Sequence, residues 1–223
     1  MPARLNRLGL PDSAFELHIA YDIGAAELAR LLGRALGACV ISQRYSRLVI
    51  DCNRAPGHSQ SIAAVSDGVA IPANLGLSAA QIAERVAAIH APYHARIADE
   101  LIAREARGLH TVLVCQHSFT PVMAGLARPW QAGVLHLGDS AVSDAMLALL
   151  RAEPGLEAGD NEPYAMDSID YTAPSHAVGP LREMLELEVR QDLIADAAGQ
   201  ARWAALLARL LPQALAARHG AGS

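Results

Sequence analysis

Apolar side chains recur every three to four residues in several stretches of the chain. Between residues 25 and 36 this spacing puts the leucines on one stripe, which predicts an amphipathic helix. Ser78 and Gln81 fit the pattern of a capping box, so a helix is expected from Ser78 to Arg107, kinked or divided by Pro92. Further helices are expected from Ser140 to Arg151 and from Gln200 to Arg218.

Short apolar runs predict the strands between these helices. From Leu185 to Val189 the residues alternate strictly, so three apolar side chains share one face and Glu186 and Glu188 point the other way. Segments 55–77 and 155–179 are rich in Gly, Pro and polar residues and are expected to be mostly loop. The other expected strands are residues 40–41, Arg47–Cys52, Thr111–Cys115 and Gly133–Leu137.

Strands that alternate with helices predict an α/β fold, with a sheet covered on both faces. No internal repeat or linker divides the 223 residues, so a single domain over residues 1–223 is expected. Hydrophobic residues make up 52% of the chain, which is enough for a sizeable core.

Charge and cysteine content narrow the possible partners. The net charge is −5 and no basic block is present, which argues against nucleic acid and against an anionic membrane surface. The longest apolar segment, residues 204–217, is interrupted by Arg209 and Pro212, and no secretory signal is visible. Three widely spaced cysteines fit a reducing compartment, so a cytoplasmic location is expected.

Arg47, Asn53 and Arg54 flank the apolar run Leu48–Ile50. Guanidinium groups bind carboxylates through paired hydrogen bonds, so two arginines beside an asparagine could form a carboxylate receptor. The alternative is a strand edge that carries ordinary salt bridges.

Several residues could serve a metal or a proton transfer. His117 could bind zinc or hydrogen-bond to the chain, and Asp22 could bind a metal or cap the following helix. Glu188 could act as a general base beside a metal-bound water, or be an exposed strand residue paired with Arg190. The spacing of His90 and His94 suits a helical zinc pair, but Pro92 lies between them and favours a structural role.

Arg54, His117 and Glu188 each lie at or near the end of an expected strand. Ligands of α/β sheets bind beyond the carboxyl ends of strands. If those strands are neighbours, the three side chains converge on one site.

Seven segments, in order along nearly the whole chain, resemble the N-formylglutamate amidohydrolases, relatives of the zinc carboxypeptidases and of aspartoacylase. The segments are His18–Gly24, Ser46–Arg54, Ala91–His94, His117–Pro121, Arg128–Trp130, Asn161–Tyr164 and Glu186–Leu193. The resemblance implies a three-layer α/β sandwich with a mixed central sheet, a zinc-carboxypeptidase-like fold of the phosphorylase/hydrolase-like type.

The resemblance also implies a zinc-dependent hydrolase of small N-acyl acidic amino acids such as N-formylglutamate. His117 would then be a metal ligand, Asp22 would lie near the metal, and Glu188 would be the base that deprotonates the zinc-bound water. Asn53 and Arg54 would hold the substrate carboxylate. Arg47 would polarise the scissile carbonyl or help to hold a second carboxylate.

Family members carry a histidine motif ahead of the segment that starts at His18, and this sequence does not contain it. A misassigned or truncated start would explain the gap, and so would a real loss of strong zinc binding. A strand missing with the motif would leave a sheet edge at which a homodimer could form. The alternative function is a non-catalytic binding protein that keeps the carboxylate pocket without a complete metal site.

Overall fold

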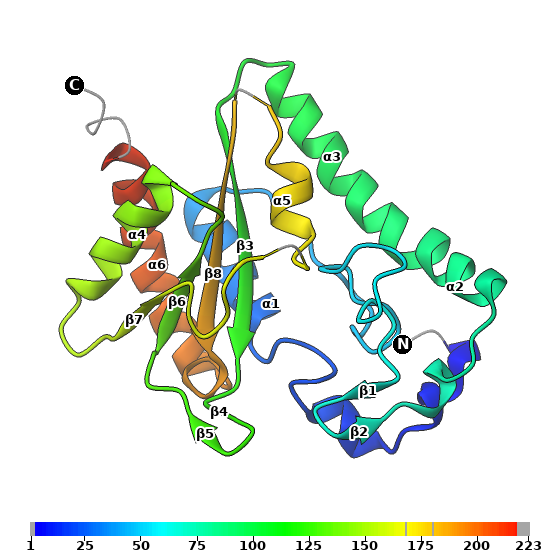
Figure 1. Cartoon of the computed structure of the whole chain (residues 1–223). Helices are drawn as coiled ribbons and strands as arrows, with labels where there is room; N and C mark the ends of the chain where they lie inside the picture. The colour runs from blue at the N-terminus through cyan, green and yellow to red at the C-terminus, as the bar shows by residue number, and fades with distance from the viewer. Residues whose placement is uncertain (1–2, 168, 180, 218–223) are drawn as a thin grey trace. The chain divides into compact units, whose positions relative to one another are not determined.

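The computed structural model describes residues 3–167, 169–179 and 181–217 (Figure 1). The chain divides into two compact units, and each unit is built from segments far apart in the sequence. The first unit comprises Met1–Tyr21, Ile41–His110 and Ser168–His176, and the second comprises Asp22–Val40, Thr111–Asp167 and Ala177–Ser223. Each unit has its own hydrophobic core. None of the described helices is long and apolar enough to cross a membrane.

The second unit is built around a four-stranded mixed sheet, as predicted. Its strands are β3 (Thr111–Phe119), β6 (Ala132–Leu135), β7 (Ala158–Asp160) and β8 (Arg182–Arg190). The strand order is β3-β8-β6-β7. β3 is parallel to β8 and β6 is parallel to β7, whereas β6 and β8 are antiparallel. Pairing of a second copy along an edge of this sheet stays a prediction.

One face of the sheet is apolar and is covered by helices. The alternation predicted for β8 is confirmed, since Leu185, Leu187 and Val189 all lie in the core of this unit. Most of the other core residues come from three helices: α1 (Ala25–Leu36), α4 (Ala141–Arg151) and α6 (Ala197–Ala217). Figure 1 shows these helices beside the sheet. The sandwich of three layers stays a prediction, because among the described residues of this unit helices are found on this face alone.

The opposite face of the sheet is polar. His117 on β3 pairs in register with Glu188 on β8, and Cys115 pairs with Glu186. Gly133 on β6 is also opposite Glu188. Neighbouring residues in register point to the same side of a sheet, so these side chains share one face. Glu186 and Glu188 are only 2% and 6% exposed, and the possibility of an exposed strand glutamate is therefore wrong for Glu188.

The first unit is dominated by a long helical segment. The capping box at Ser78 is confirmed: Gln81 N–H donates to Ser78 Oγ, and Ser78 N–H donates to Gln81 Oε1. The predicted division near Pro92 occurs as a π turn, in which the N–H of Ala91 bonds to the carbonyl of Val86. The segment consists of α2 (Ala79–Arg85), the π turn η4 (Val86–His90) and α3 (Ala91–Glu105).

Short elements complete both units. In the first unit they are η1 (Ala3–Gly9), η2 (Asp12–Glu16), β1 (Val65–Ser66), β2 (Val69–Ala70), η3 (Pro72–Asn74) and α5 (Thr172–His176). In the second unit they are the hairpin of β4 (Val122–Met123) and β5 (Leu126–Ala127), and η5 (Gln191–Leu193). The expected loops at 55–77 and 155–179 therefore contain a hairpin, β7 and α5.

The strand predicted at Arg47–Cys52 is wrong, and no strand forms at residues 40–41. Residues 47–49 form a turn, although Leu48, Val49 and Ile50 are fully buried. Side chains replace the missing ladder of backbone hydrogen bonds. Asn74 Nδ2 donates to Leu48 O at 2.9 Å, and Arg85 Nη1 donates to Val49 O at 2.9 Å. A buried apolar run needs partners for its backbone groups, but those partners need not come from a sheet.

Replacement of Asn74 by alanine should destabilise the first unit strongly. Asn74 also donates to Ala63 O at 2.7 Å and accepts from Arg85 Nη1 at 2.6 Å, so Asn74→Ala leaves several buried polar groups without a partner. At about 1–3 kcal/mol for each such group, we expect the free energy of unfolding to fall by roughly 3–5 kcal/mol. Urea unfolding measures the change. Gln60→Ala, at an exposed site of the same unit, should change it by less than about 0.5 kcal/mol.

Candidate functional site

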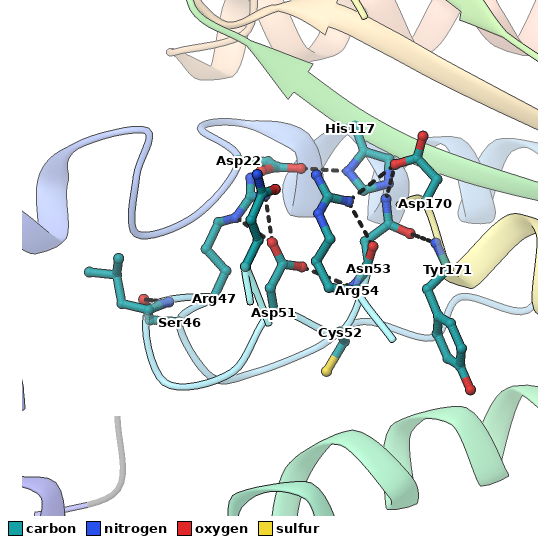
Figure 2. A network of polar contacts seen from close by, with 12 residues as sticks. Asp22, Ser46, Arg47, Asp51, Cys52, Asn53, Arg54, His117, Asp170 and Tyr171 are labelled. Atoms are coloured by element: carbon teal, nitrogen blue, oxygen red, sulfur yellow. Dashed lines mark hydrogen bonds and ion pairs between the residues drawn. The ribbon is translucent and has the colours of Figure 1, made fainter. Parts of the chain in front are cut away.

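In the first unit, Asn53 and Arg54 together hold a carboxylate. Arg54 Nη1 donates to Asp170 Oδ1 at 3.1 Å, and Asn53 Nδ2 donates to the same oxygen at 3.2 Å. Figure 2 shows the Asp170 carboxylate facing both side chains. The side chains of Arg54 and Asp170 are only 15% and 11% exposed, so this ion pair is poorly solvated. The local chemistry is that of a carboxylate receptor, and a carboxylate of the chain lies in it.

The amide oxygen of Asn53 has a second task. It accepts hydrogen bonds from the backbone N–H groups of Tyr171 and Thr172, at 3.2 and 2.9 Å. These N–H groups lie at the start of α5, where a helix leaves donors without partners inside the helix. Asn53 therefore ties its own loop to the first turn of α5.

Arg47 lies in the same loop but in a different environment. Its Nη2 and Nε contact Asp51 Oδ2 at 2.6 and 3.1 Å, while Asp51 Oδ1 accepts from the N–H of Asn53 at 2.8 Å. The Arg47 side chain is 40% exposed. Arg47 thus makes an ordinary salt bridge, which was one of the two alternatives that the sequence allowed. Through Asp51 it is linked to Asn53.

Three histidines of the first unit, His90, His94 and His176, form a cluster next to the loop at residues 52–54. His94 Nδ1 lies 2.9 Å from His176 Nε2, and His94 Nε2 lies 2.9 Å from the carbonyl oxygen of Cys52. His90 Nε2 lies 3.1 Å from the carbonyl oxygen of Arg54. The rings of His90 and His94 have centroids 4.3 Å apart, and those of His94 and His176 are stacked at 5.2 Å.

Burial disfavours the charged form of His94 and of His90. Desolvation lowers the pKa of His94 to about 4, and it outweighs the hydrogen bond to Cys52, which favours the charged ring. The neighbouring rings of His90 and His176 lower it further. The pKa of His90 is also lowered, mainly by burial.

In the second unit, His117 lies within a carboxylate cluster. His117 Nδ1 is 2.7 Å from Asp22 Oδ2, a contact that Figure 2 also shows. Ser118 Oγ donates to the carbonyl of Ile23 at 2.8 Å, which holds the segment after Asp22 against β3. With Glu188 beside His117 in the sheet, an imidazole and two carboxylates lie within one unit.

The charge of this cluster is reflected in the pKa of His117. Burial alone would lower it, but the hydrogen bond to Asp22 and the negative charges of Glu186, Asp22 and Glu188 raise it to about 10. The surrounding carboxylates therefore favour the protonated form of the imidazole. The same field would favour any other cation at that place, including a divalent metal.

Glycine lets a second segment approach Glu188. A Cβ at Gly133 would lie 2.0 Å from the carbonyl oxygen of Glu162, and one at Gly159 would lie 2.5 Å from the Cβ of Glu162. The chain at Glu162 therefore lies directly against the polar face of the sheet. This close approach accounts for two glycines in neighbouring strands.

Comparison with known proteins identifies the family of this chain. The sequence profile of one family, N-formylglutamate amidohydrolase, matches residues 1–195. The chain belongs to the N-formylglutamate amidohydrolase family. The family resemblance read from the seven segments is thus confirmed.

A solved structure similar to this family member is the crystal structure of gene product Atu2144 from Agrobacterium tumefaciens. The two share 37% sequence identity with a TM-score of 0.93, over 97% of this chain and 86% of the other. No curated protein matches the chain.

The zinc that the family resemblance implies would need a set of donor groups from the chain. A catalytic zinc usually takes three protein ligands. Within the described residues, no three His, Cys, Asp or Glu side chains come together as a metal-binding group. His117 and Asp22 could supply two ligands, but Nδ1 of His117 already contacts Asp22. The described residues therefore do not complete a zinc site.

The structure places the predicted site residues in two groups. Arg47, Asn53 and Arg54 belong to the first unit, and Asp22, His117 and Glu188 belong to the second. Within the second unit, His117 is brought to both Asp22 and Glu188. The predicted convergence of Arg54 with His117 and Glu188 stays a prediction. Its premise was wrong in part, because Arg54 does not follow a strand.

Sequence reasoning missed the partners that complete each group. Asp170 is 116 residues from Arg54, and no local pattern marks it as the partner. Glu186 carried a usable signal, since it shares a strand face with Glu188. His176 carried none, whereas His90 and His94 had been recognised as a pair, and their predicted structural role fits the contacts described.

The neutral state of His94 should make stability depend on pH. Its pKa is near 4 in the folded chain and about 6.5 when the ring is free, so the unfolded chain binds more protons between these values. Its contribution is complete above pH 6.5 and is lost as the pH falls towards 4. We expect the urea midpoint of His94→Gln to fall less over this range than that of the parent. His110→Gln, at an exposed site, should keep the parent's pH dependence.

Proposed function

We propose that this chain hydrolyses the amide bond of an N-acyl acidic amino acid such as N-formylglutamate. Membership of an amidohydrolase family supports the reaction class. The observation that carries the proposal is the group on the polar face of the sheet, where the buried Glu188 lies in register with the partly exposed His117 and His117 contacts Asp22. Such a group is suited to activate water and to transfer a proton.

Glu188 is proposed as the general base. Its carboxylate takes a proton from the attacking water as the oxygen bonds to the carbonyl carbon. The same proton then passes to the amide nitrogen as the carbon–nitrogen bond breaks, which releases the amino acid as its amine and the acyl group as a carboxylic acid. The acid then gives its proton to the amine or to solvent and becomes a carboxylate. Burial of Glu188 limits its solvation and keeps it in one orientation.

Zinc is proposed as the metal, with His117 and Asp22 as two of its ligands, and the described residues supply no third ligand beside them. A coordinating imidazole must be neutral, so binding of a metal would displace the proton that the surrounding carboxylates now favour. Zinc in such enzymes polarises a carbonyl oxygen and makes water more acidic. Calorimetry with zinc at two pH values would measure affinity and proton release together.

Asn53 and Arg54 are proposed to bind the substrate carboxylate. The carboxylate of Asp170 already lies against both donors, which supports the match of charge and geometry. A substrate carboxylate would share Arg54 with Asp170 or displace it. Arg47 is proposed to polarise the scissile carbonyl or to hold a second carboxylate, and its greater exposure leaves it more accessible.

The proposal predicts formate release from N-formylglutamate and its loss on removal of the base. We expect Glu188→Gln to lower kcat by about 10²–10⁴-fold, because the amide cannot accept the proton from water. A coupled formate assay with added zinc measures the effect. Glu183→Gln, a change in the same strand outside this cluster, should keep kcat within about twofold of the parent.

A parent chain that releases no acyl group from a panel of N-acyl acidic amino acids, with or without zinc, would exclude the hydrolase. Saturable binding of N-formylglutamate without turnover would instead support the non-catalytic alternative.

A further inference from the structure

The two carbonyl groups on either side of Asn53 are each held by a histidine. Cys52 O lies 2.9 Å from His94 Nε2, and Arg54 O lies 3.1 Å from His90 Nε2. A carbonyl oxygen can only accept, so both Nε2 atoms must carry a hydrogen and donate. The backbone on both sides of Asn53 is therefore fixed by side chains from the helical segment.

The same argument fixes the remaining proton of the cluster. Neutral His94 with a hydrogen on Nε2 has a bare Nδ1, which must accept from Nε2 of His176 at 2.9 Å. His176 belongs to α5, and Asn53 caps the start of that helix. Thr172 Oγ1 also donates to Cys52 O, at 3.2 Å. Together these contacts link α3 to the loop at residues 52–54, the loop to α5, and α5 back to α3.

Placing this cluster inside the unit carries a cost that an apolar core would avoid. His90 and His176 are buried, and Tyr171 packs edge-on against His94 with ring centroids 4.9 Å apart. Buried imidazoles lose hydration that only complete hydrogen bonding can offset. As core packing, this cluster costs more free energy than apolar side chains would. It is well suited to orient a backbone, because each ring N–H donates along one direction.

We propose that His94, supported by His90 and His176, is a positioning residue that holds the Asn53–Arg54 backbone so that the Arg54 guanidinium is ready to bind a substrate carboxylate. This inference rests on the proposed function of Asn53 and Arg54. The histidines do not touch the substrate. They set the affinity for its carboxylate and leave the bond-breaking step unchanged.

Enzyme kinetics can separate positioning from a general loss of stability. His94→Leu removes the donor to Cys52 O, and we expect KM for N-formylglutamate to rise about tenfold, with kcat within about twofold of the parent. His94→Gln keeps an N–H donor and should recover most of the affinity. Ile97→Ala is the matched control, because it removes a buried side chain of the same helix that cannot donate a hydrogen bond to the loop. It should lower the melting temperature and leave KM unchanged.

Hydrogen exchange provides a readout that does not require turnover. The N–H groups of Asp51, Asn53 and Arg54 are all hydrogen-bonded within the unit, so they should exchange slowly in the parent. In His94→Leu we expect faster exchange across residues 51–54, with little change in Ile97→Ala. His176→Leu keeps the contact between His94 and Cys52, so we expect a smaller increase in exchange across residues 51–54. It replaces His94→Leu in this experiment if His94→Leu does not fold.

Unchanged exchange at residues 51–54 in both His94→Leu and His176→Leu would overturn the proposal. An increase in KM that Ile97→Ala reproduces, or a fall in kcat at constant KM, would do so as well. If the parent shows no turnover, the proposed function fails, but altered exchange confined to the loop would still support the positioning role.

Discussion

A buried turn has no neighbouring strand to bind its carbonyl groups, and this constraint shapes the whole first unit. The carbonyl oxygens of Leu48 and Val49 are bound by Asn74 and Arg85, and those of Cys52 and Arg54 by histidines. Each donor comes from a distant segment, and most are themselves buried. The polar interior of this unit is therefore a consequence of its irregular backbone, because the buried carbonyl groups need side-chain donors.

In the second unit the backbone carbonyl groups find their partners within a sheet. The buried polar side chains of this unit therefore have a different origin. Strand pairing satisfies the backbone, so the buried carboxylates Glu186 and Glu188 are not needed to hold the sheet together. Buried carboxylates are expensive unless something nearby carries positive charge. Protonation of His117, which the neighbouring carboxylates favour, would supply it here. These buried carboxylates lower the stability of the second unit at the face of the sheet where the catalytic chemistry is proposed.

Sequence patterns predicted those features that local chemistry determines. The alternation along β8 gave the correct faces, and the capping serines at Ser78 and Ser140 marked the starts of α2 and α4. The apolar run at Leu48–Ile50 was misread, because three buried residues look alike in a strand and in a turn whose carbonyls are bound by side chains. The site was predicted residue by residue through family resemblance, but Asp170 and His176 depend on contacts between distant segments that spacing does not encode.

The π turn at Val86–His90 has a consequence for the tolerance of this segment to deletion. Arg85 precedes the turn and His94 follows it, yet both donate to the same short stretch of backbone, at Val49 and Cys52. Loss of one residue from the turn would restore an ordinary α-helix and rotate everything upstream by about 100° relative to α3. Arg85 and His94 would then be out of phase and could not both reach their carbonyls. The spacing between these two residues should therefore be fixed among functional descendants of this sequence, even where the side chains between them vary.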